Sequence, residues 1–235
     1  MKFFPYDSRQ KAGEILANFI LSLDSKISEN IKENPLDFFL YVIPNGGVPV
    51  AEMFCKSLKI KYDLLIVRKL KIPYNTEAGF GSVTTDGTVL FNESLLSHLS
   101  LSKEQIENAI QTTKLEIEGR IKFYSKKSVS DDAYRNYIYN KYIFLIDDGL
   151  ASGFTMLAGI KMIKKYNPME IYVAIPTAPL GTIKKIEKNV DRIFCPNIRE
   201  TRWFAVADAY KHWYDVHDSE VLDILKKSQF YIENS

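Results

Sequence analysis

The chain has 235 residues, of which 46% are hydrophobic, so it is long enough to bury the core of one large domain. Its 31 basic and 29 acidic residues leave a net charge of +2, which gives no field suited to a dedicated nucleic-acid-binding protein. No apolar run approaches the roughly 20 residues of a membrane span, and the opening residues turn polar too quickly for a signal peptide. The composition therefore predicts a cytoplasmic protein with neither a membrane nor a nucleic acid as its partner.

Residues of the usual redox and metal-binding types are few and scattered. Cys55 and Cys195 lie far apart in apolar surroundings without CxxC spacing, which favours buried, reduced thiols. His98, His212 and His217 show no metal-ligand spacing with the cysteines. The sequence also contains no HExxH, Walker A or EF-hand motif, so zinc, P-loop and calcium sites are not predicted.

Helices and strands are expected to alternate from the start of the chain. Apolar residues at helical spacing between Ile15 and Ile27 predict an amphipathic helix. The continuous apolar run 37–43 predicts a strand covered on both faces. A helix is expected over 50–58, and a second buried strand over 63–67.

The segment 79–91 differs in composition from its surroundings. The turn signal Asp86-Gly87 separates two runs rich in β-forming residues, which predicts a hairpin. A long helix is expected from Lys103 onward, because a capping-box pattern precedes it.

Alternation continues in the second half of the chain. A third buried strand is predicted over 142–146, followed by a helix that ends near Tyr166, before a proline. A fourth strand is predicted over 170–175 and a short one over 192–195. This order predicts one α/β domain, 1–235, with a doubly wound, mostly parallel sheet whose ligands bind at the carboxyl edge.

The strongest functional signal is the segment 142–155, YIFLIDDGLASGFT. A hydrophobic strand ends in Asp147 and Asp148, a loop of small residues follows, and a helix begins at once. Free backbone N–H groups and the positive helix terminus form an anion site there. The two carboxylates need other partners, namely sugar hydroxyls or a divalent cation. A ribose 5-phosphate combines these features, whereas an ordinary turn capped by Asp is the alternative.

This segment resembles the motif with which type I phosphoribosyltransferases bind 5-phosphoribosyl 1-pyrophosphate (PRPP), and matched positions span roughly residues 8–225. The resemblance implies that Asp147 and Asp148 hold the ribose hydroxyls, and hold Mg²⁺ directly or through PRPP. It also implies that five loop residues bind the 5′-phosphate. They are Ala151, Ser152, Gly153, Phe154 and Thr155.

Two shorter motifs extend the resemblance to the pyrophosphate (PPi) end of PRPP. Asn45-Gly46-Gly47 resembles the PPi loop of the family, which exposes backbone N–H groups. Predicted phosphoribosyltransferases of bacteria and archaea often have Arg where this chain has Asn45, so one expected cation is missing. Arg68 and Lys69 resemble the V-R-K-L of the same proteins and are expected near PPi, where they partly replace that cation. A plain turn and two solvated cations are the alternative interpretations.

A lid and a hood are expected beside the site. The hairpin at 75–92 is a candidate lid that excludes water from PRPP, and residues 196–235 form a candidate hood. Trp203 or Phe204 is a candidate for stacking on an acceptor base. Packing within the core of the hood is the alternative for these aromatic residues.

The resemblance implies an enzyme that transfers ribose 5-phosphate from PRPP to a nitrogen nucleophile such as a nucleobase, with Mg²⁺ as cofactor and PPi as product. It also implies a homodimer. A regulator of the same fold that senses PRPP or a nucleotide is the alternative. The general base is open, because Ala151 stands where 6-oxopurine enzymes have an Asp; the candidates are Glu77 and Glu200.

Overall fold

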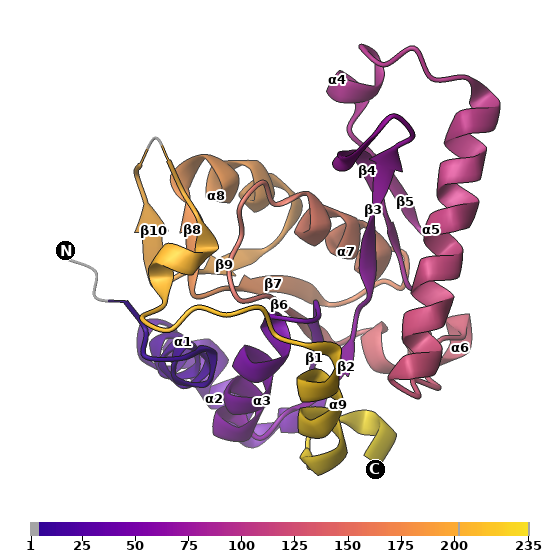
Figure 1. Ribbon diagram of the computed structural model, residues 1–235. Helices are drawn as coiled ribbons and strands as arrows, with labels where there is room; N and C mark the ends of the chain where they lie inside the picture. Colours follow the sequence, from indigo (N-terminus) through magenta and orange to yellow (C-terminus); the bar gives the residue numbers. More distant parts are fainter. Residues whose placement is uncertain (1–4, 202, 235) are drawn as a thin grey trace.

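The chain folds around a five-stranded parallel sheet, as predicted (Figure 1). The computed structural model describes residues 5–201 and 203–234, apart from the side chains of residues 76, 77 and 234. The strands of this sheet are β1 (Phe38–Val42), β2 (Lys61–Leu64), β6 (Tyr142–Ile146), β7 (Glu170–Ala174) and β9 (Arg192–Phe194). Their spatial order is β2-β1-β6-β7-β9, and each neighbouring pair is parallel. The winding direction reverses between β1 and β6, and a crevice for ligands is expected at such a point.

Helices cover both faces of the sheet. One face packs against α1 (Arg9–Leu23), α2 (Ser25–Glu33), α3 (Gly47–Leu58) and α9 (Asp218–Lys227), and the other against α6 (Asp131–Ile138), α7 (Phe154–Lys164) and α8 (Leu180–Ile186). Alternate residues of β1 enter the two cores, since Leu40 packs on the first face and Tyr41 on the second. A strand buried on both faces needs an apolar residue at every position, which explains the continuous apolar runs of the sequence.

Two element boundaries differ from the sequence prediction. The first amphipathic segment is two helices, because the side chain of Asp24 accepts a hydrogen bond from Ile27 N (3.0 Å) and so caps a new helix. The predicted strand 63–67 is also divided. Strand β2 ends at Leu64, and the chain then enters β3 (Val67–Ile72), which belongs to another sheet.

A three-stranded antiparallel sheet stands beside the central one, with helix α5 along it (Figure 1). It consists of β3, β4 (Asn75–Thr84) and β5 (Val89–Phe91), while α4 (Glu93–Leu96) and α5 (Lys103–Phe123) follow it in the chain. The antiparallel pairing of β4 with β5 confirms the predicted hairpin. Helix α5 begins with the predicted capping box, in which Ser102 and Gln105 exchange hydrogen bonds.

The remaining elements lie near the carboxyl edge. Strands β8 (Thr177–Pro179) and β10 (Asn197–Arg199) form a small parallel sheet. The segment after β10 returns to the start of the chain, where Tyr6 N donates to Ala209 O (2.8 Å) and Lys211 N donates to Tyr6 O (2.8 Å). Among the described residues, no helix combines the length and the apolar character that crossing a membrane requires.

Asp86 holds the turn of the hairpin and ties it to the end of α7. Its carboxylate accepts hydrogen bonds from Thr88 N (2.9 Å), Thr84 Oγ1 (2.6 Å), Lys165 Nζ (2.6 Å) and Tyr166 OH (3.2 Å). Burial alone would raise the pKa of Asp86, but the hydrogen bonds from Lys165, Thr84 and Thr88 lower it below its usual value. The ionised form of Asp86 is therefore the form that stabilises the hairpin.

We expect Asp86→Asn to lower the free energy of unfolding at pH 7 by about 1–3 kcal/mol, the range for hydrogen bonds to a charged group. Because the folded pKa is depressed, this contribution is fully present above the unfolded pKa of about 3.9 and is lost as the pH falls through the folded pKa. Urea unfolding at several pH values should show a constant difference from pH 5 to 8 that shrinks below about pH 4. Asp132→Asn, at an exposed position of α6, is the control. A difference that persists unchanged at pH 3 would contradict the role of the charge.

Candidate active site

The loops that follow β1 and β6 meet at the carboxyl edge, where the winding of the sheet reverses. A Cβ atom added to Gly46 would lie 2.0 Å from Asp148 Oδ2, and one added to Gly47 would lie 3.1 Å from Asp147 Cα. Only glycine allows this approach of the two loops. The structure therefore brings together the predicted PPi loop and the predicted acidic pair, which are about a hundred residues apart in the sequence.

The predicted phosphate-binding residues connect β6 to the first turn of α7. They are Ala151, Ser152, Gly153, Phe154 and Thr155. Gly153 caps α7 with a φ of 74°, in the left-handed region that favours glycine. Thr182 Oγ1 donates to Ala151 O (2.6 Å), which fixes the loop from the side of α8. Ala151 and Ser152 are exposed, so the loop and the positive end of α7 are open to an anion.

Asp148 has a buried partner that the sequence analysis did not identify. Arg9 Nε donates to Asp148 Oδ2 (2.8 Å), and both side chains are almost entirely buried. Arg9 Nη1 donates to Tyr214 O (2.9 Å), and the guanidinium carbon lies 4.1 Å from the centre of the Trp213 ring. Tyr210 OH donates to Asp148 O (2.6 Å). The segment after β10 thus encloses the ion pair.

The acidic pair is short of positive charge. Burial raises the pKa of Asp147 well above its usual value, and the charge of Asp148 raises it further. Burial also raises the pKa of Asp148, although the hydrogen bond from Arg9 opposes this effect. The positive charge of Arg9 therefore offsets the negative charge of two adjacent carboxylates only in part.

This charge deficit and the oxygen donors suit Mg²⁺, which prefers one or two carboxylates together with oxygens of a phosphorylated substrate. The described residues contain no group of three or more His, Cys, Asp and Glu side chains that could hold a metal ion alone. Asp147 and Asp148 could therefore hold Mg²⁺ only if substrate oxygens or water complete the coordination.

Asn45, in the predicted PPi loop, belongs to a hydrogen-bonded cluster at the loop. Its Nδ2 donates to Asp218 Oδ1 (2.8 Å) and to Val216 O (2.9 Å), and the Pro44–Asn45 peptide bond is cis. Arg120 of α5 donates from Nη1 to Asn45 Oδ1 (3.0 Å) and to Asp218 Oδ1 (2.9 Å). An arginine thus lies at the loop after all, supplied by a helix about 75 residues further along the chain.

Arg68 and Lys69, the other predicted PPi-binding residues, lie at the start of β3. Together with Lys71, Glu116 and Arg120 they line an open cavity of about 490 Å³. The structure therefore groups both predicted cations with Arg120. There was no reason in the sequence to group Arg120 with Arg68 and Lys69, because α5 lies far from these residues and from Asn45 in the chain.

The candidates for the acceptor site and the general base differ in exposure and position. Trp203 is 84% exposed, and Phe204 is partly buried. Glu200 is exposed and lines a separate cavity of about 360 Å³ beside α8. No hydrogen bond found among the described residues joins these three to the acidic pair. The side chain of Glu77 lies outside the described part of the chain, so its predicted role stays a prediction.

The fold and the paired loops define an α/β protein with a candidate anion-binding site at the carboxyl edge of its sheet. Residues 11–213 match the family described as "Phosphoribosyl transferase domain". The chain belongs to this phosphoribosyltransferase family, as its motifs predicted.

Individual relatives agree with the family. Proteins from two strains of Mycobacterium tuberculosis, each named "Putative phosphoribosyl transferase", are 25% identical over 228 residues, which are 97% of this chain and 47% of theirs. The chain thus spans about half the length of these curated relatives. A uracil phosphoribosyltransferase of Mycoplasma genitalium is 30% identical over 152 residues, or 62% of this chain and 60% of that protein. The crystal structure of TT1426 from Thermus thermophilus has the same fold, with a TM-score of 0.71 at 21% identity, over 94% of this chain and 97% of that one.

Proposed function

We propose that this chain transfers ribose 5-phosphate from PRPP to a nitrogen nucleophile, such as a nucleobase, and releases PPi. The observation that carries the proposal is the meeting of two loops at the carboxyl edge. Gly46 and Gly47 lie against Asp148 and Asp147, next to the amino end of α7. A site with one anion-binding loop on each side of two carboxylates suits a sugar that carries phosphate groups at both ends.

Each part of PRPP would have a partner in this arrangement. The loop 151–155 and the positive end of α7 would bind the 5′-phosphate through backbone N–H groups. Asp147 and Asp148 would accept hydrogen bonds from the 2′- and 3′-hydroxyls of the ribose. The backbone N–H groups of Gly46 and Gly47 would donate to PPi. Binding at both ends leaves C1 of the ribose fixed between them.

The reaction needs little covalent chemistry from the protein. The bond from C1 to the PPi oxygen breaks and its electron pair leaves with PPi, while the lone pair of the nitrogen nucleophile forms the new bond to C1 with inversion. The ribose carries oxocarbenium-like charge in between. Arg68 and Lys69 would stabilise the charge that develops on PPi. Bound Mg²⁺ supplies further positive charge beside PPi, and the acidic pair has the oxygen donors to hold it.

Other residues would bind the acceptor and activate its nitrogen. Ala151 provides no carboxylate, so a general base would come from Glu77 or Glu200. Trp203 or Phe204 would stack on an acceptor base. The hairpin 75–92 would act as a lid against water, and residues 196–235 as a hood.

The test is the release of PPi from PRPP and Mg²⁺ with a panel of acceptors: purines, pyrimidines, ammonia, and small aromatic amines and acids. We expect release that depends on one acceptor and stays at background without any. If no acceptor gives release, calorimetry with PRPP alone shows whether the protein binds PRPP at all. Binding without release would favour a PRPP-sensing regulator, and no binding would refute the proposal.

A further inference from the structure

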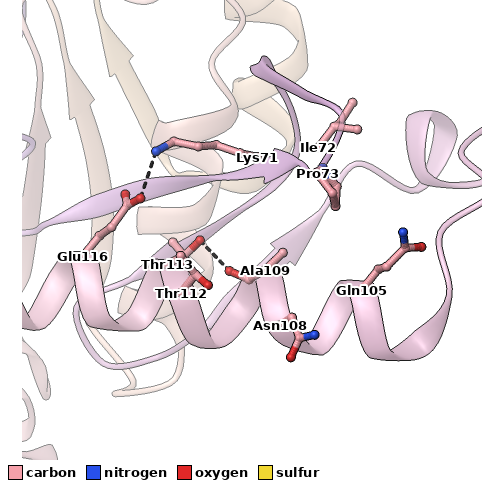
Figure 2. A pocket seen from close by; sticks show the side chains of 9 residues that line it. All are labelled: Lys71, Ile72, Pro73, Gln105, Asn108, Ala109, Thr112, Thr113 and Glu116. Atoms are coloured by element: carbon pink, nitrogen blue, oxygen red, sulfur yellow. Dashed lines mark hydrogen bonds and ion pairs between the residues drawn. The ribbon is translucent and has the colours of Figure 1, made fainter.

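The open cavity beside the PPi loop is strongly cationic. Arg68, Lys69, Lys71 and Arg120 line it, and among the described side chains the carboxylate of Glu116 lines it with them. Glu116 is already neutralised, because Lys71 Nζ lies 2.9 Å from its Oε1 (Figure 2). Arg68, Lys69 and Arg120 add further positively charged groups to the lining of this cavity. A polyphosphate is the ligand class that matches this density of charge.

Arg120 is held in one orientation by one end of its guanidinium group. Its Nη1 donates to Asn45 Oδ1 (3.0 Å), Tyr124 OH (2.8 Å) and Asp218 Oδ1 (2.9 Å). Burial alone would raise the pKa of Asp218, but hydrogen bonds from Asn45 and Tyr124 and the charge of Arg120 lower it below its usual value. Asp218 therefore stays ionised at neutral pH and keeps Arg120 in place.

The other end of the guanidinium group is available. Nε and Nη2 of Arg120 donate to no acceptor in the described part of the chain, although the side chain is only 22% exposed. An arginine fixed by Nη1 presents Nε and Nη2 as a preorganised pair of donors, which is the geometry that binds phosphate oxygens in a bidentate manner. Arg120 also lines the cavity that contains Arg68 and Lys69.

We infer that Arg120, held by Asn45 and Asp218, binds the diphosphate group of the substrate and supplies from helix α5 the cation that the loop itself lacks. Asn45 is then a positioning residue: its short side chain fixes Arg120 instead of contacting diphosphate with a charge of its own. This inference rests on the proposed function and adds a diphosphate-specific residue to it. Ribose 5-phosphate lacks the diphosphate group that Arg120 would bind.

Arg120→Gln tests the inference through the difference between two ligands. We expect the affinity for PRPP, measured by calorimetry with Mg²⁺, to fall about 10- to 100-fold, since a bidentate charged contact is lost. The affinity for ribose 5-phosphate, which has no diphosphate, should stay within about twofold. Inhibition by added PPi should weaken in parallel with the affinity for PRPP.

Lys122→Gln is the matched control, because it removes the same charge from an exposed position of the same helix and should leave both affinities unchanged. A purely structural Arg120 would lower both affinities equally in Arg120→Gln, together with the melting temperature, and that result would overturn the inference. Unchanged binding of PRPP by Arg120→Gln, when the wild type binds it, would also overturn the inference and leave the proposed function intact.

Glu116→Gln provides a second variant, should Arg120→Gln fail to fold. Glu116 is partly exposed, and the substitution frees Lys71 and removes a carboxylate from the cavity. We expect severalfold tighter binding of PRPP, reduced by added salt, and unchanged binding of ribose 5-phosphate. Weaker or unchanged binding of PRPP by Glu116→Gln would contradict a diphosphate in this cavity.

Discussion

Replacing Arg9 with glutamine is expected to lower the free energy of unfolding by about 3–5 kcal/mol, the range for removing one partner of a buried ion pair. Arg9 and Asp148 are both almost entirely buried, with Nε and Oδ2 2.8 Å apart. Without the guanidinium group, the Asp148 carboxylate would remain beside Asp147 and would lose the ion pair that it makes among the described residues. Urea unfolding at pH 7 measures the loss. Lys11→Gln, in an exposed pair on the same helix, should cost less than about 1 kcal/mol.

The double variant Arg9→Gln/Asp148→Asn separates the charge of Arg9 from its packing. Two neutral side chains leave no unpaired charge, so the double variant should be more stable than Arg9→Gln alone by about 2 kcal/mol or more. Part of the loss should remain, since Arg9 also contacts the ring of Trp213 and the carbonyl of Tyr214. Additive losses in the two single variants would show that the ion pair is not what stabilises this region.

The parts of the candidate site that are continuous in the chain could be read from the sequence as motifs. The acidic pair, the loop 151–155 and the PPi loop are each a short motif after a buried strand, and strand order then brings them to one edge. The boundary between α1 and α2 could also have been predicted, because Asp24 is a good helix-capping residue.

The two arginines beside the candidate site could not be predicted in the same way. Arg9 contacts Asp148 across 139 positions, and Arg120 contacts Asn45 across 75. Each begins or belongs to an amphipathic helix, where a lone arginine normally lies in solvent. Asn45 indicated that a cation was missing from the loop, and the position of Arg120 beside Asn45 depends on how α5 packs against the antiparallel sheet.

The roles of the aromatic residues after β10 also could not be read from the sequence. The composition of this segment favoured either packing within the core of the hood or stacking on an acceptor base. In the structure, different aromatic residues make different contacts. Tyr210 is buried and binds the backbone of Asp148, whereas Trp213 and Tyr214 surround Arg9. Trp203 is exposed and remains the candidate for an acceptor. Periodicity alone cannot separate these roles, because they depend on contacts with the start of the chain.

Asp147→Asn is expected to lower the rate of PPi release per unit of PRPP, kcat/KM, by about 100-fold or more, the usual effect of removing one preorganised polar group from a transition state. Asp147 lies against Gly47 of the PPi loop and makes no ion pair with any described residue. Its charge is therefore not needed by the fold. Asp208→Asn, at an exposed position after β10, should keep full activity.

Stability should change in the opposite direction in Asp147→Asn. Since burial and the charge of Asp148 raise the folded pKa of Asp147, its ionisation opposes folding, and this cost is present above the folded pKa. The asparagine variant should thus unfold at equal or higher urea concentration at pH 7, and the difference should vanish as the pH falls below the unfolded pKa of about 3.9. Retained activity would exclude Asp147 from the site, and lost activity with lost stability would make it a structural residue. Higher stability together with lost activity is the combination expected of a carboxylate that serves a ligand and not the fold, because burial and the charge of Asp148 make its ionisation costly.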